Sequence, residues 1–135
     1  MVSWNNLDTL SSYKELADVK PACLTEVMSG DNGAERVKNY SVPMAAGLSY
    51  NYASKQVNEN VLDALEKLAD EAQLADKFKA LYNGEVVNTG EKRLVLHHMT
   101  RGQLGDAVEA DGVDKRTFYK TQQERIAEFA NKVHN

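Results

Sequence analysis

The residues with the clearest chemical potential gather in one stretch, Gly84 to Arg101, with the sequence GEVVNTGEKRLVLHHMTR. Arg93 and Arg101 lie on either side of a short apolar run, and two adjacent histidines, His97 and His98, follow that run. Glycines and a lysine precede it. These residue types could form a phosphate-binding loop, a metal site or a basic patch, and their spacing decides between these chemistries.

A phosphate-binding P-loop has Gly, four residues, then Gly-Lys-Ser/Thr, because its backbone N–H groups curl around the phosphate while the Lys reaches it. Here five residues separate Gly84 from Gly90, and Glu91, Lys92 and Arg93 follow. Glu91 would repel a phosphate, and no hydroxyl side chain follows the lysine. The stretch therefore predicts a turn from a helix into an extended connection, and no nucleotide site.

The side chains best suited to a transition metal are His97, His98, His134 and Cys23. Adjacent histidines point about 100° apart on a helix and to opposite faces of a strand, so one ion cannot readily bind both. No His-Glu-x-x-His motif occurs. We expect no metal and no other cofactor. Instead, one of the paired histidines should hydrogen-bond a backbone carbonyl in the core, and the other should lie on the surface.

Cys23 is the only cysteine, so no internal disulfide can form, which fits a reducing cytosol and a cytoplasmic location. It lies between Ala22 and Leu24 on an expected apolar face, where cysteines are usually inert. No Gly-x-Ser-x-Gly elbow occurs. Since nothing indicates a nucleophile, we assign no catalytic residue.

A helix-turn-helix over residues 104–125 is an alternative interpretation. A Gly-Val turn and a Thr-aromatic-Tyr helix are features of bacterial DNA-binding regulators, and four cations could meet phosphates: Lys115, Arg116, Lys120 and Arg125. Against it, Asp111 adds a residue before Gly112 and rotates the first helix relative to the turn. Acidic side chains also crowd residues 106–114, where they would repel phosphates. We expect an exposed acidic loop, then an amphipathic helix, and no nucleic-acid partner.

Apolar residues at steps of three and four predict helices. Pro21 should separate the first two, Asn58 is a candidate N-cap, a break is expected near Gln73, and Gly84 fits the left-handed position after a helix. Residues 29–33 have the composition of a loop. The expected helices cover residues 7–20, 22–28, 58–72, 74–82 and 117–133, with one more turn over 34–39.

Beyond Tyr40 the apolar residues fall mostly at even spacing. Period two with aromatic residues predicts a short strand or hairpin around 48–57. The expected fold is mainly α, a helical segment with one small β-hairpin near 48–57. At 135 residues, without internal repeats or a long linker, the chain is expected to form a single domain, residues 1–135.

The totals limit the function classes. A net charge of −4 gives no global basic field for nucleic acid or an anionic membrane. No apolar run approaches the ~20 residues that span a bilayer, and the first residues lack the basic and apolar regions of a signal peptide. We therefore expect neither a membrane partner nor secretion.

The stretch from Gly84 to Arg101 resembles a segment near the N-terminus of glucose-6-phosphate isomerases, where a Gly-Glu, an Asn, a Thr-Glu and an Arg-Ala-Val-Leu-His run close on Arg. Further similar blocks lie around Trp4 and Leu7, at 26–28, at 48–57 and at 62–82, and another covers 122–135. The sequence departs from the family at Gly90, Leu94, Met99 and Thr100. The matching positions in the stretch are Gly84, Glu85, Asn88, Glu91, Arg93, Val95, Leu96, His97 and Arg101.

This resemblance implies the N-terminal segment of an isomerase that interconverts glucose 6-phosphate and fructose 6-phosphate in glycolysis and gluconeogenesis. In the family, the catalytic base and a Gly-Gly-Ser phosphate loop lie farther along, in α/β sugar-isomerase domains. This sequence contains no Gly-Gly, so the resemblance implies that those domains are absent. The fragment itself is then structural and inactive, with no catalytic, cofactor-binding or metal residue, and sugar phosphate is bound only by the missing domains.

The same resemblance implies partners: the remainder of the isomerase chain, and a second subunit in a homodimer. Arg93 and Arg101 are expected to hold segments together by hydrogen bonds and ion pairs, with His97 as a packed core histidine. The isolated fragment should expose an apolar patch and self-associate. Two alternatives of other classes stay open, the DNA-binding regulator and a free-standing helical interaction module.

Overall fold

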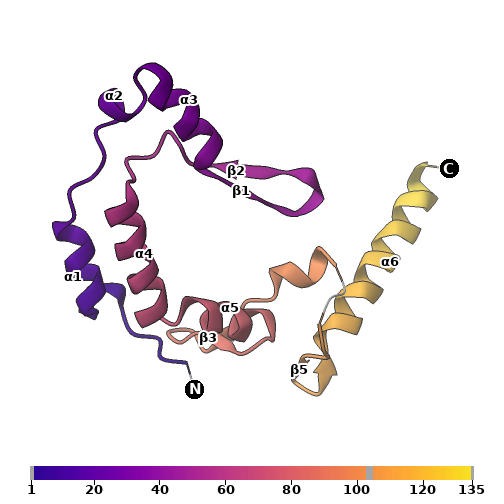
Figure 1. The fold of residues 1–135 in the computed structure, drawn as a ribbon. Coiled ribbons are helices and arrows are strands. Elements are labelled where there is room, and N and C mark those ends of the chain that lie inside the picture. The colour runs from indigo at the N-terminus through magenta and orange to yellow at the C-terminus, as the bar shows by residue number, and fades with distance from the viewer. Residues whose placement is uncertain (1, 103–104, 135) are drawn as a thin grey trace. The chain divides into compact units, whose positions relative to one another are not determined.

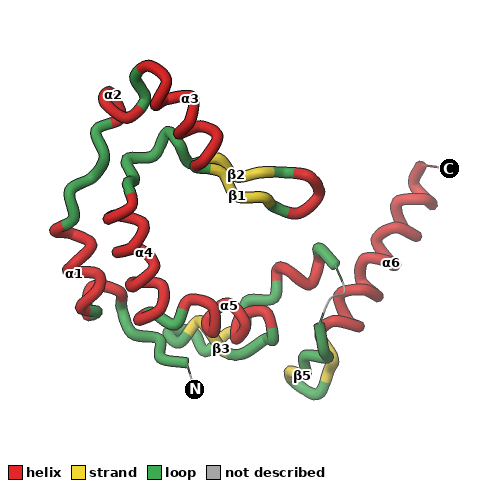
Figure 2. Tube along the Cα trace, in the orientation of Figure 1, coloured by secondary structure: helices red, strands yellow, loops and turns green. Residues whose placement is uncertain are grey.

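The structure is a computed structural model that describes residues 2–102 and 105–134. Its contacts divide the chain into two compact units. The amino-terminal unit comprises residues 5–72, and the carboxy-terminal unit comprises residues 73–135 together with 1–4. Helices dominate and strands occur only as short pairs (Figures 1 and 2), which confirms the mainly α prediction. Of the helices in the described residues, none combines the length and hydropathy that a bilayer crossing requires.

Two helices of the amino-terminal unit, α1 (Ser11–Asp18) and α4 (Glu59–Glu71), pack against each other. A 3₁₀ turn precedes α1, and the extended backbone of Leu10 separates the two, so the helix predicted over 7–20 is shorter than expected. The carboxylate of Glu71 accepts hydrogen bonds from the first turn of α1, including the N–H of Ser12 at 2.8 Å. Because first-turn N–H groups lack partners within their own helix, this carboxylate caps α1 and fixes it to α4.

Two further helices of this unit are α2 (Leu24–Val27) and α3 (Gly30–Asn39). The prediction of a loop over 29–33 was wrong, because α3 begins inside that range. Its composition favoured a loop, but Gly33 lies directly against the backbone carbonyl of Met28, where a β-carbon would clash. This close local approach requires glycine at position 33, despite the low helix propensity of that residue.

A β-hairpin is present, but its position differs from the prediction. β1 (Ser41–Pro43) pairs antiparallel with β2 (Ser49–Asn51), with Val42 opposite Tyr50. Only the beginning of the range 48–57 is therefore a strand. The period-two pattern located the second strand and missed the first.

Two local features explain the shift. Pro43 lies in β1, because proline is tolerated at the edge of a sheet and both strands of a two-stranded ribbon are edges. After β2, the side-chain oxygen of Asn51 accepts the N–H of Ala53 at 3.0 Å. This turn ends the strand at the point where the even spacing of apolar residues continues.

The long predicted helix over 58–72 and its break are confirmed. The side-chain oxygen of Asn58 accepts the N–H of Val61 at 3.0 Å and so caps α4. Gln73 has a left-handed backbone, with φ of 53°, and separates α4 from α5 (Leu74–Tyr82). Gly84, with φ of 75°, follows α5 in the left-handed position predicted for it.

The carboxy-terminal unit continues from α5 with two small hairpins and a long helix. The first hairpin carries an irregularity in its register, and a 3₁₀ turn over His97–Thr100 follows it. The last helix is slightly longer than the predicted range 117–133. The elements are β3 (Val86–Asn88), β4 (Arg93–Leu94), β5 (Glu109–Ala110), β6 (Val113–Asp114) and α6 (Lys115–His134).

A small apolar core holds this unit together. Leu96, Met99 and Val108 are buried against one another, and Leu94 and Tyr119 pack around them. The core thus joins the 3₁₀ turn, the segment before β5 and the first turns of α6. The stretch around Leu96 is structural, as the turn-and-connection prediction implied.

Candidate functional site

The two arginines of the stretch 84–101 are exposed. The Nη1 atom of Arg93 lies 3.6 Å from Oε2 of Glu91. Because both side chains are more than half exposed, this ion pair stabilises the unit by about 1 kcal/mol at most. Arg101 is also exposed. Neither guanidinium joins elements within this unit among the described residues, so a joining role in a longer protein stays a prediction.

The paired histidines divide as expected between core and surface, but in the opposite order. His97 is exposed, so its assignment as the core histidine was wrong. His98 is half-buried, and its Nε2 lies 3.0 Å from the carbonyl oxygen of Tyr82. The His98 ring also stacks on the Tyr82 ring, with centroids 4.7 Å apart. Because a carbonyl only accepts, Nε2 must carry the proton in this contact.

Arg116 is the buried cation of this unit, with 6% of its surface exposed. Its Nη2 donates to the carbonyl of Tyr82 at 3.1 Å, and its Nε donates to the carbonyl of Asp106. The guanidinium also lies over the Tyr82 ring, 5.4 Å from the centroid. The carbonyl oxygen of Tyr82 therefore accepts hydrogen bonds from both His98 and Arg116. This cluster of three residues joins α5, the 3₁₀ turn and α6.

These contacts contradict the helix-turn-helix interpretation. Residue 104 lies outside the described residues, but β5 and β6 form a hairpin where a first helix would need to end, and Arg116 points inward instead of toward a phosphate. Asp111 and Gly112 have positive φ values of 54° and 70°, as in a tight type I′ turn. The acidic loop predicted for 106–114 is therefore partly an ordered hairpin. An Asp-Gly pair is the usual signal for such a turn, and it was available in the sequence.

Asp114 caps α6. Its carboxylate accepts the N–H of Arg116 at 3.1 Å and the hydroxyl of Thr117 at 2.5 Å. The Thr117 hydroxyl, followed by backbone N–H donors, lowers the pKa of Asp114. In the same way, the hydroxyl and N–H of Ser12 lower the pKa of Glu71 to about 2. Both carboxylates are structural acceptors that stay ionised at neutral pH.

The amino-terminal unit contains a second buried arginine, Arg36. Its guanidinium donates to the carbonyl oxygens of Ala53, Lys55 and Val57 at 2.8, 3.1 and 2.7 Å. It also lies 4.0 Å from the centroid of the Tyr40 ring. Arg36 thus ties α3 to the segment between β2 and α4 and satisfies carbonyl groups that no strand or helix pairs.

The sequence arguments missed these polar anchors. Arg36, Glu71 and Arg116 resemble ordinary charged residues on amphipathic helices, and their partners are backbone groups distant in sequence. No local motif marks such contacts. Only the Asp-Gly turn before Arg116 could have indicated that its helix starts next to a hairpin.

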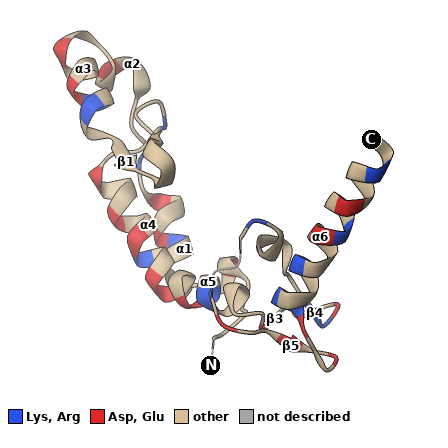
Figure 3. Cartoon of the chain, turned by 90° about the vertical axis from the view of Figure 1, so that its right-hand side faces the viewer, with Lys and Arg blue, Asp and Glu red and all other residues tan. Residues whose placement is uncertain are grey.

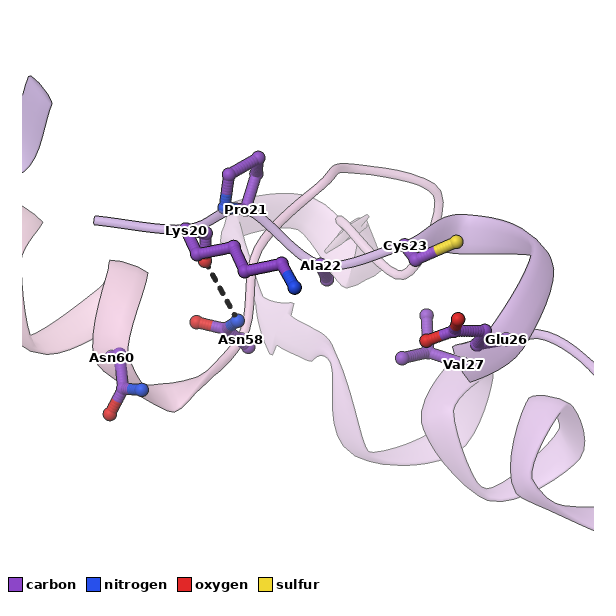
Figure 4. Close-up of a pocket in the computed structure, with 8 residues that line it drawn as sticks. All are labelled: Lys20, Pro21, Ala22, Cys23, Glu26, Val27, Asn58 and Asn60. Carbon is purple, nitrogen blue, oxygen red and sulfur yellow. Dashed lines mark hydrogen bonds between the residues drawn. The ribbon is translucent and has the colours of Figure 1, made fainter. Parts of the chain in front are cut away.

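A cavity of about 340 Å³ in the amino-terminal unit contains the only cysteine (Figure 4). Cys23 is exposed there, so the expectation that it lies on an apolar face was wrong. Within residues 2–102 and 105–134, no three His, Cys, Asp or Glu side chains converge as a metal site would require. The residues that line the cavity are Lys20, Pro21, Ala22, Cys23, Glu26, Val27, Asn58 and Asn60.

A hollow of about 730 Å³ in the carboxy-terminal unit has charged side chains in its lining, among them Glu85, Arg93 and Glu109. Two further features are apolar. A groove of about 280 Å³ lies between the hairpin and α4, lined by Val42, Tyr50, Tyr52, Lys55, Val57, Leu62 and Leu65. In the carboxy-terminal unit, α6 carries exposed large apolar side chains, among them Ile126 and Phe129. Such surfaces bind other apolar surfaces, so this chain has the features of a part that packs against something else.

Comparison with known proteins agrees with this description. The Phosphoglucose isomerase family model matches residues 51–135. The glucose-6-phosphate isomerase of Treponema denticola is 43% identical over 139 residues, which cover 99% of this chain and 26% of that protein. The glucose-6-phosphate isomerase of Borreliella afzelii is 41% identical over 137 residues, which cover 100% of this chain and 25% of that protein.

A solved structure shows the same relationship. The crystal structure of a glucose-6-phosphate isomerase from Chlamydia trachomatis superposes with a TM-score of 0.73 at 25% identity, over 93% of this chain and 25% of that one. The chain thus spans about a quarter of the length of these relatives and matches their N-terminal part. The resemblance predicted from residues 84–101 is confirmed, and the chain belongs to the phosphoglucose isomerase family.

Proposed function

We propose that this chain is the N-terminal helical domain, residues 1–135, of a glucose-6-phosphate isomerase, which interconverts glucose 6-phosphate and fructose 6-phosphate. The family match over residues 51–135 carries the proposal. The reaction opens the sugar ring and moves a proton between C1 and C2 through an enediol. It requires a poised carboxylate base and a cradle for the phosphate.

We further propose that these 135 residues alone do not catalyse the reaction. The support is the share of the relatives that the chain covers, about a quarter of their length, which leaves most of such an enzyme outside these residues. In this proposal the remainder of the isomerase chain supplies every catalytic and phosphate-binding residue, and the complete enzyme is a cytoplasmic homodimer.

A coupled assay tests both parts. Fructose 6-phosphate is supplied, and the glucose 6-phosphate formed is oxidised by a dehydrogenase while NADPH absorbance is followed. We expect no turnover by the 135-residue chain, and turnover when the same residues are joined to the remaining three quarters of the Treponema denticola relative. The intact relative is the positive control.

Two outcomes would contradict the proposal. Turnover by the 135-residue chain would mean that catalytic residues lie within it. An inactive joined protein that is folded by circular dichroism would mean that this segment does not serve as the N-terminal part of such an enzyme. The reading frame distinguishes the alternative of a free-standing interaction module. For such a module the frame would stop at Asn135, whereas for the isomerase it would continue into a Gly-Gly-Ser loop.

A further inference from the structure

One face of α6 is apolar and open. The exposed fractions are 45% for Phe118, 67% for Ile126, 69% for Phe129 and 65% for Val133. At about 100° per residue these four positions fall within an arc of roughly 80° around the helix. They form one apolar face, which we call the α6 stripe; Gln122 lies on the same arc between Phe118 and Ile126. Exposed stripes of this kind usually mark an interaction surface.

The second half of α6 has little support within its own unit. The first turns are held by Arg116 and by Tyr119, which packs against the small core. Among the described residues, the tertiary hydrogen bond farthest along the helix runs from the side chain of Gln123 to the carbonyl of Thr100 at 2.8 Å. Helical segments shorter than about 12–15 residues are marginal in water without tertiary packing. The end of α6 therefore needs a partner for its stripe.

Charges border this stripe on one side only. At the same angular spacing, Arg125 and Lys132 lie along one edge, while Gln123 and Ala130 lie along the other. Figure 3 shows both basic and acidic residues along α6, and by the same angular spacing Glu128 lies beyond Arg125 and Lys132, farther from the stripe. A matching surface is thus an apolar groove with carboxylates along one rim.

We infer that the α6 stripe docks into such a groove on the part of the isomerase polypeptide that the relatives carry beyond the quarter matched here. The inference rests on the proposed function. It is supported by the length of the relatives, about four times the matched segment, and by a family match that extends to residue 135. Covalent continuity gives this occupant a high effective concentration.

A second copy of the chain fits the α6 stripe less well. Antiparallel pairing of two α6 helices would bring the edge carrying Arg125 and Lys132 against the same edge of the other copy, and like charges would meet. Four large apolar side chains are also far fewer than the ~20–30 residues per side of a stable interface between separate chains. The docking surface therefore suits a tethered partner.

Hydrogen exchange tests the inference in two proteins, the 135-residue chain and the same residues joined to the remaining three quarters of the Treponema denticola relative. We expect the amides of residues 124–134 to exchange at least about a hundredfold more slowly in the joined protein, because burial of two or more large apolar side chains opposes opening. The amides of the first turns of α6 serve as an internal reference.

Variants of the joined protein locate the contact. Ile126→Asp with Phe129→Asp should return the exchange of residues 124–134 toward the rate in the 135-residue chain. Arg125→Glu with Lys132→Glu should accelerate it about tenfold, a loss of the rim attraction. Ala127→Asp is the matched control, since position 127 lies on the side of the helix opposite the α6 stripe and should change exchange little.

The outcomes separate this inference from the proposed function. Equal exchange of residues 124–134 in both proteins would overturn the docking even if the joined protein is active. Slow exchange in an inactive joined protein would support the docking and contradict the proposed function. Slow exchange in the 135-residue chain that increases with protein concentration would overturn the inference in favour of a second copy.

Discussion

Met99 is the most informative side chain to perturb in the carboxy-terminal unit. It has no exposed surface and packs with Leu96 and Val108 in the core that joins the 3₁₀ turn to α6. Met99→Ala therefore tests how much this fully buried side chain contributes to the stability of the core.

The expected loss is large for so small a unit. Alanine removes the γ-carbon, the sulfur and the methyl group, and at about 0.8 kcal/mol per buried group the transfer term is about 2.4 kcal/mol. Incomplete collapse of the space raises the loss to about 3–4 kcal/mol. A unit of this size has a free energy of unfolding of about 3–10 kcal/mol, so the variant should lose a third of it or more.

Urea unfolding monitored by tryptophan fluorescence measures this loss, because Trp4 is the only tryptophan and belongs to the carboxy-terminal unit. With a slope of about 1–3 kcal/mol per molar urea, Met99→Ala should lower the midpoint by about 1–3 M. Met99→Leu, which nearly keeps the volume, should cost less than about 1.5 kcal/mol. Equal midpoints for the two variants would refute the assignment of Met99 as the close-packed centre of this core.

Other contacts give shorter predictions. Glu71→Gln should lower the melting temperature and speed amide exchange in α1. Since folding lowers the pKa of Glu71 from 4.5 to about 2, the stability that the wild-type carboxylate contributes is complete above pH 4.5 and is lost toward pH 2. Acid unfolding of the variant should lack this loss of stability. Asn58→Ala should cost about 1 kcal/mol in thermal unfolding by removing the cap of α4. Gly84→Ala should cost more than about 1 kcal/mol in urea, because its φ is 75° and its β-carbon would meet Val108. His98→Ala should cost about 1–3 kcal/mol, whereas His97→Ala should stay within about 0.5 kcal/mol in the same measurement.

Structural features that depend only on neighbouring residues in the sequence were predictable. The cap at Asn58, the break near Gln73 and the left-handed Gly84 each depend on a residue and its immediate neighbours, and the structure has all three. The division of the two histidines between core and surface also followed from geometry, because adjacent side chains in a helix or strand point apart. Which histidine faces inward depended on the position of Tyr82, which no local rule supplies.

Features that depend on contacts distant in sequence were not predictable. The buried arginines find their acceptors in loop carbonyls 10 or more positions away. α3 was missed for a different reason: the close approach of Gly33 to the carbonyl of Met28 is local, but a composition rule considers residue types and not contacts.

The stretch from Gly84 to Arg101 contains two sets of side chains, one buried and apolar, the other exposed and polar. Its apolar residues, centred on Leu96 and Met99, build the core of the unit, and any residues of similar shape would serve that purpose. Its polar residues that match the isomerase pattern, such as Arg93, His97 and Arg101, are exposed and contribute little to that core. A segment whose distinctive residues face outward, on a unit whose last helix also presents an open apolar face, has its binding surfaces directed away from itself. Under the proposed function, these surfaces face the polypeptide that the relatives carry beyond the quarter matched by this chain.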